Sequence, residues 1–156
     1  MFLEIDGKPK NLSLGTIEEA TRFYGKYLLG RLYRNIYLTV IFQKFDKDCN
    51  DYAYCDWVDN NRYAREFEIT ICDNLSKKET LLALAHEMVH LKQYARGELK
   101  DILRPARMVK WKGEPINPEE ADYWELPYEI EAYGRERGLY LKYMSFVRND
   151  HKNGSI

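Results

Sequence analysis

The segment from Ser76 to Gly97 constrains the fold of this chain more than any other part of the sequence. Ser76 and Glu79 have the spacing of a capping box, and KKETLLALAHEMVHLKQYAR then runs to Gly97 without a helix-breaking residue. Apolar residues lie on nearly every side of the predicted helix, which is typical of a buried helix. The remaining elements must therefore fold around this segment.

The length of the chain predicts a single domain. Its 156 residues suffice for one hydrophobic core, and we expect the domain to span 1–148 and the polar residues 149–156 to form a flexible tail. The 24 basic and 25 acidic side chains nearly cancel, so the whole molecule has no net field that would attract nucleic acid or an anionic membrane.

The order of predicted elements indicates an α+β fold. Thr16 and Glu19 resemble a second capping box, which predicts a helix over about 17–29 that ends before Gly30. Strands are expected in three segments, which we read as a small antiparallel or mixed sheet with meander connections: 34–45, 51–58 and 65–72. Prolines make the segment 98–126 irregular, and Pro127 is placed to open a final helix.

The central helix contains the motif His86-Glu87-Met88-Val89-His90. Residues four apart in a helix differ by only about 40° in direction, so both imidazoles project from one face and can share a metal ion. The motif H-E-x-x-H on a helix is typical of zinc sites in which the glutamate is the general base. We therefore expect one zinc ion held by His86 and His90, with Glu87 as the catalytic base.

The third ligand is expected to be a carboxylate, because the remaining histidine, His151, lies in the predicted tail. Glu129 shares one face of the final helix with Ala132 and Tyr133, whereas Glu131 can pair with Arg135 on the surface. This argument favours Glu129 over Glu131. Further carboxylates in the preceding loop remain open as alternatives: Glu119, Glu120, Asp122 and Glu125.

The chain resembles the gluzincin class of zincin metallopeptidases. The similarity rests on LLALAHEMVHLKQYARGEL followed by ELPYEIEAYGRE, and within it the chain looks like small phage and bacterial metallopeptidases loosely related to SprT-like proteins. In many gluzincins the third ligand opens an E-x-x-A motif, and Glu129 to Ala132 match it. SprT-like proteins often supply a third histidine instead, and this chain has none between His90 and His151.

The function expected from these features is hydrolysis of peptide bonds in a peptide or protein substrate by a zinc metallopeptidase. The resemblance implies that the strand 65–72 borders the cleft and pairs with substrate, although an interior strand fits the pattern equally well. A transition-state donor is expected among four tyrosines, between which the sequence does not choose: Tyr94, Tyr123, Tyr128 and Tyr133.

Two other functions remain open. One is a DNA-associated protease or a nucleic-acid-binding module that uses a basic stretch, although a solvated loop explains this stretch better because Glu98, Asp101 and Glu114 dilute its charge. The basic stretch comprises Lys100, Arg104, Arg107, Lys110, Trp111 and Lys112. A non-catalytic, zinc-stabilised interaction domain is the other alternative.

The expected setting is the cytoplasm. The chain has no apparent signal peptide and no apolar run long enough to span a membrane, and its cysteines Cys49, Cys55 and Cys72 form no C-x-x-C pair. Their spacing also matches no usual zinc pattern.

Overall fold

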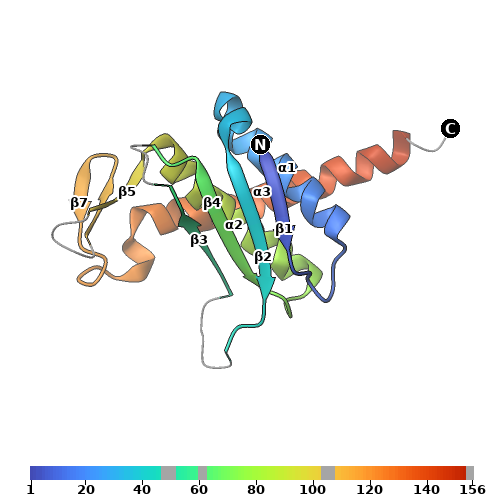
Figure 1. Ribbon diagram of the computed structural model, residues 1–156, viewed down its shortest axis with the longest axis horizontal. Helices are drawn as coiled ribbons and strands as arrows, with labels where there is room; N and C mark the ends of the chain where they lie inside the picture. The colour runs from blue at the N-terminus through green and yellow to red at the C-terminus, as the bar shows by residue number, and fades with distance from the viewer. Residues whose placement is uncertain (47–51, 60–62, 103–107, 154–156) are drawn as a thin grey trace.

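A computed structural model describes residues 1–46, 52–59, 63–102 and 108–153, and its centre is a four-stranded sheet with helices on one face (Figure 1). The strands in sheet order are β1 (Phe2–Asp6), β2 (Tyr37–Gln43), β4 (Glu66–Cys72) and β3 (Ala53–Trp57). The helices are α1 (Leu14–Leu29), α2 (Lys77–Arg96) and α3 (Pro127–Asn153), with short 3-10 turns η1 (Gly30–Asn35) and η2 (Tyr123–Glu125). The expected α+β class is confirmed.

The connections within the sheet differ from the predicted meander. β1 runs parallel to β2, and β2 runs parallel to β4, so only β3 is antiparallel to its neighbour. The meander was wrong because β1, a five-residue strand that we did not predict, occupies one side of β2 and β4 takes the other. β3 is thereby placed at the free edge of the sheet, and β4 becomes an interior strand.

The core lies between this sheet and the helices. The predicted alternation in β4 is confirmed for Phe67, Ile69 and Ile71, which are buried, and for Glu66 and Glu68, which are exposed. Thr70 is also buried although it falls on the outward side of the strand. One face of the sheet therefore supplies the apolar surface on which α1 and α2 pack.

The helix ends follow the local sequence, with one shift. α2 begins with the predicted capping box, in which Ser76 and Glu79 each bond the other's backbone N–H, and it ends at Gly97 with a left-handed φ of 69°. α1 starts three residues earlier than expected because Ser13, rather than Thr16, is the capping residue and accepts a hydrogen bond from the Thr16 N–H.

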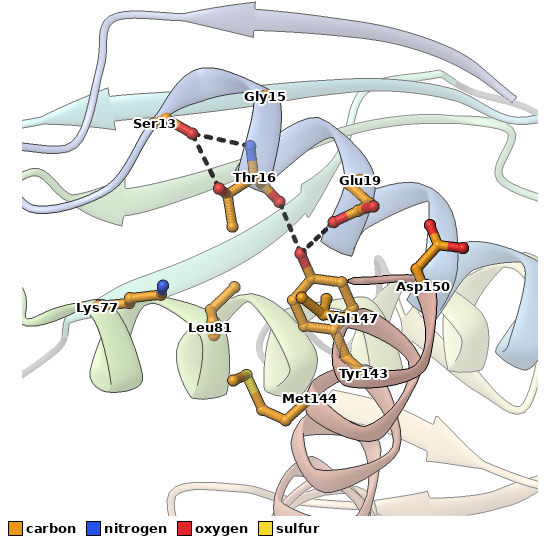
Figure 2. Close-up of a pocket in the computed structure, with 10 residues that line it drawn as sticks. All are labelled: Ser13, Gly15, Thr16, Glu19, Lys77, Leu81, Tyr143, Met144, Val147 and Asp150. Carbon is orange, nitrogen blue, oxygen red and sulfur yellow. Dashed lines mark hydrogen bonds between the residues drawn. The ribbon is translucent and has the colours of Figure 1, made fainter. Parts of the chain in front are cut away.

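The final helix starts at Pro127 as predicted, but it is longer than expected. It continues to Asn153 through part of the segment assigned to the tail, so flexibility of that segment stays a prediction. Its far half is tied to the first turns of α1 by Tyr143, whose hydroxyl donates to the Glu19 carboxylate at 2.8 Å (Figure 2). Neither α3 nor another described helix combines the length and apolar character needed to cross a membrane.

The segment that we expected to be irregular contains a second, small sheet. It consists of β5 (Leu99–Ile102), β6 (Met108–Trp111) and β7 (Glu114–Ile116), paired in this order as antiparallel strands. Lys112 and Gly113 connect β6 to β7 with positive φ angles of 50° and 98°, which is the conformation of a tight hairpin turn. Prolines excluded a long element there but not three short strands.

The packing of α3 predicts opposite effects at two positions. Ala132 is fully buried in the core, so the larger side chain in Ala132→Leu should overpack it and lower the free energy of unfolding by about 1–3 kcal/mol. Gly138 lies on the same helix with open space around its Cα, so Gly138→Ala should raise that free energy by about 0.5–1 kcal/mol. Urea denaturation measures both changes, and equal stability of the two variants would contradict this account of the packing.

Candidate metal centre

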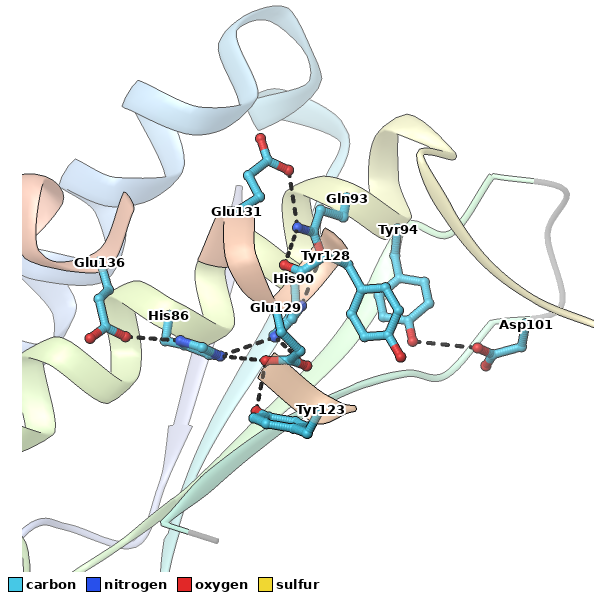
Figure 3. A network of polar contacts seen from close by, with 10 residues as sticks. All are labelled: His86, His90, Gln93, Tyr94, Asp101, Tyr123, Tyr128, Glu129, Glu131 and Glu136. Carbon is cyan, nitrogen blue, oxygen red and sulfur yellow. Dashed lines mark hydrogen bonds and ion pairs between the residues drawn. The ribbon is translucent and has the colours of Figure 1, made fainter. Parts of the chain in front are cut away.

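The two histidines of α2 converge with a glutamate of α3 (Figure 3). The Nε2 atoms of His86 and His90 lie 3.1 Å apart. The carboxylate of Glu129 lies 3.4 Å from the first and 3.5 Å from the second. All three side chains are buried, and among the described residues they form the one group of at least three His, Cys, Asp or Glu side chains close enough to hold an ion together.

The outer nitrogens of both imidazoles are bonded in a way that fixes where their protons lie. His86 Nδ1 donates a hydrogen bond to the Glu136 carboxylate over 2.9 Å. His90 Nδ1 is 2.9 Å from Gln93 Oε1. The amide of Gln93 is itself oriented, because its Nε2 donates to the Tyr128 carbonyl and to Glu131, each at 3.0 Å. Each neutral imidazole therefore directs the lone pair of Nε2 into the cluster.

Two imidazole nitrogens and the two oxygens of one carboxylate thus face one another, and a cation or a proton between them relieves the repulsion of their lone pairs. Ligand atoms at about 2.0–2.1 Å from a tetrahedral zinc ion lie about 3.3 Å apart. The two Nε2 atoms lie 3.1 Å apart, and each lies 3.4 or 3.5 Å from a different oxygen of the Glu129 carboxylate, which is close to this spacing. The donor set of two imidazoles and one carboxylate is also one that zinc accepts.

A proton is the competing occupant of the cluster. Burial by itself lowers the pKa of His86, but hydrogen bonds with Glu129 and Glu136 outweigh it and raise the pKa to about 9. Burial likewise raises the pKa of Glu129, but the hydrogen bonds with His86 and His90 hold it well below its usual range. Both shifts express the same attraction for positive charge.

Glu87 lies in the same cleft as the cluster. Its side chain is buried, and it lines a hollow of ≈ 260 Å³ together with the three candidate ligands and with residues of β3. This location fits the general-base role predicted for Glu87, which stays a prediction. The strand that borders the cleft is β3, through Ala53, Tyr54 and Cys55, rather than the segment 65–72. The edge-strand interpretation of 65–72 was therefore wrong, and the interior alternative holds.

Glu131 lies outside the cluster and belongs to a separate network of charges. Its carboxylate accepts from Lys92 and from Arg135, each at 2.9 Å, and the latter is the pair expected from the sequence. Lys92 is almost entirely buried and also contacts Glu98 at 2.6 Å. Through Gln93, Glu131 nevertheless supports His90 indirectly, a connection that the sequence argument did not anticipate.

The loop carboxylates are not part of the cluster. Glu119, Glu120, Asp122 and Glu125 are exposed. Asp122 instead caps the turn η2, because its carboxylate accepts from the Trp124 N–H at 3.0 Å. The structure thus brings one of the candidate third ligands, Glu129, to the histidines.

The four tyrosines lie at different places around the cleft. Tyr123 donates to Glu129 at 2.7 Å, and the ring of Tyr133 packs edge-on against His86 at 4.6 Å. Tyr128 lines the cleft, where burial and the charge of Glu129 raise its pKa to about 12. Tyr94 donates to Asp101 at 3.4 Å. Of the four, Tyr94, Tyr123 and Tyr128 line the cleft, and among the described contacts only Tyr123 bonds a candidate ligand.

Sequence reasoning missed the residues that orient the histidines. Gln93 follows His90 by three positions, and Glu136 follows Glu129 by seven, so both spacings place them on the required helix faces. Neither was assigned a role, because many polar residues on a helix share such a spacing and only the crossing of α2 and α3 selects among them.

The cysteines and basic residues that the structure describes do not add to this centre. Burial, followed by the charges of Glu87 and Asp56, raises the pKa of the Cys55 thiol, which disfavours a thiolate there. Cys49, Arg104 and Arg107 lie outside the described residues. Lys100 and Lys110 are cross-strand neighbours in the small sheet, and a nucleic-acid role for them stays a prediction.

Comparisons with models of known protein families, with curated proteins and with solved structures gave no match for this chain.

Proposed function

We propose that this chain is a zinc-dependent metallopeptidase with His86, His90 and Glu129 as ligands and Glu87 as the general base. The observation that carries the proposal is the convergence of two imidazole nitrogens on one carboxylate, with the outer nitrogen of each imidazole already hydrogen-bonded. A pair of neutral histidines serving only as core residues would gain nothing from directing both Nε2 lone pairs at a carboxylate.

The chemistry follows from the position of Glu87 next to the cluster. When bound, zinc polarises the carbonyl of the substrate and acidifies a water molecule. Glu87 takes the proton from the attacking water and delivers it to the nitrogen of the leaving group. We propose Tyr128, which lines the cleft, as the donor of a hydrogen bond to the oxygen that becomes negative during attack.

The substrate backbone is expected to pair with β3. Because β3 is an edge strand, one side of it carries backbone N–H and C=O groups that no described strand bonds. An extended peptide that adds to this edge passes over the cleft, since Ala53 and Cys55 line it. The substrate is thus expected to pair with β3 and not, as the sequence suggested, with the segment 65–72.

Metal analysis of the purified protein, combined with digestion of an unfolded protein, tests the proposal. About one equivalent of zinc with cleavage that stops on chelation supports it. Cleavage only in the presence of DNA would favour the DNA-associated protease, and zinc without any turnover would favour the interaction domain.

Glu87→Gln should retain zinc and lose about 10²–10⁴-fold in kcat, because the amide cannot accept a proton while the three ligands are unchanged. Initial rates on a fluorogenic peptide and zinc content of the same sample measure the two effects. Near-normal turnover by a zinc-loaded variant would rule out Glu87 as the base.

Glu129→Ala should weaken zinc binding by at least about tenfold, because it removes one of three ligands. Glu120→Ala is the matched control, since this exposed carboxylate lies outside the cluster and its loss should leave the affinity unchanged. Competition with a chromophoric chelator measures both affinities. Equal affinity of the two variants would mean that the carboxylate ligand lies elsewhere.

Zinc binding near pH 7 should release about one proton from His86, because its raised pKa of about 9 keeps the metal-free imidazole protonated, whereas the metal requires the neutral form. The release from this group should disappear as the pH rises above 9. Calorimetric titrations in buffers of different ionisation enthalpy count the protons. A release that stays constant across this range would show that His86 does not carry the competing proton.

A further inference from the structure

Three aromatic side chains beside the candidate metal centre are exposed and adjacent to one another. Trp124 is 66% exposed, Tyr123 46% and Tyr133 41%. Their rings contact one another, with centroids 5.4 Å apart for Tyr123 and Trp124 and 5.2 Å apart for Trp124 and Tyr133. We call these three residues the aromatic platform. Contiguous exposed rings of this kind commonly mark a binding surface.

The aromatic platform is fixed in position relative to the candidate ligands. Tyr123 donates to Glu129 at 2.7 Å, and Tyr133 packs against the His86 ring. Trp124 sits in the turn η2, which Asp122 holds by accepting the Trp124 N–H. Tyr123 also lines the cleft itself, so the platform continues the cleft outward over a preformed surface.

The surroundings of the platform carry negative charge. From 113 to 134 the sequence contains seven acidic residues and no lysine or arginine. Two of the seven, Glu129 and Glu131, are bonded within the protein, and Arg135 and Arg137 follow this segment. Asp122 and Glu125 flank Trp124 and are exposed, and neither forms an ion pair within the described part of the chain. Aromatic faces attract cations, tryptophan most strongly, and neighbouring carboxylates add to this attraction.

We propose that the aromatic platform binds an arginine or lysine side chain of the substrate, so that the protein acts on peptides with a basic residue close to the bond that is cleaved. This inference rests on the proposed function, because it takes the bound peptide to be the substrate of a peptidase. An apolar side chain would use the rings alone and leave the charges of Asp122 and Glu125 uncompensated. Nucleic acid is disfavoured at this surface because its phosphates would meet like charge.

Binding in the Glu87→Gln background tests this recognition without turnover. Two fluorescent peptides that differ at one central position are compared, one with arginine there and the other with the uncharged residue norleucine. Fluorescence anisotropy measures the affinity of the zinc-loaded protein for each peptide. We expect the arginine peptide to bind about fivefold more tightly, and Trp124→Ala to abolish this difference. Trp124→Phe should restore part of it. Tyr27→Ala removes an exposed aromatic side chain on α1 and should leave both affinities unchanged.

The outcomes separate this inference from the proposed function. Equal or tighter binding of the norleucine peptide, or a preference for arginine that persists in Trp124→Ala, would overturn the inference even if the wild-type protein cleaves peptides. A preference for arginine that depends on Trp124 would uphold recognition of the basic side chain even if the wild-type protein cleaves neither peptide, and in that case the proposed peptidase activity fails alone.

Discussion

The close contact between α2 and α3 is the constraint on which the candidate centre depends. Ala132, fully buried at this contact, allows the first turns of α3 to approach the helix that carries both histidines. Gln93 then reaches across to the Tyr128 carbonyl, which ties the backbone of α3 to α2 at the same level. Without this approach Glu129 would be one more acidic residue of an exposed helix, and the histidines would have no third partner.

The sheet contributes by deciding what lies on the other side of the histidines. Because β1 and β4 occupy both sides of β2, β3 is left at the edge, where Ala53, Tyr54 and Cys55 face the cleft. The short sheet of β5 to β7 closes the far end through Leu99. Backbone topology and helix packing thus act together, since one supplies an open edge and the other supplies the converging side chains.

The limits of sequence reasoning follow from which interactions are local. Helix α2 could be predicted almost to the residue because its signals, Ser76, Glu79 and Gly97, act within one turn of the positions that they specify. The helix face that carries Glu129 could also be predicted, because the spacing of Glu129, Ala132 and Tyr133 along the helix is local information. Strand order could not be predicted, because parallel pairing of β1, β2 and β4 depends on contacts between distant segments. The roles of Gln93 and Glu136 likewise required the helix crossing.

Charge balance gives a reason to expect a divalent ion rather than a proton in the cluster. In the neighbouring network two cations, Lys92 and Arg135, balance two carboxylates, Glu98 and Glu131. The cluster instead holds Glu129 and Glu136 against a histidine pair. With Glu87 counted as the carboxylate that general-base catalysis requires, one proton on His86 leaves a net charge of about −2, whereas a divalent ion with neutral histidines leaves about −1. Because uncompensated charge is costly at buried positions, the cluster is better matched to the ion.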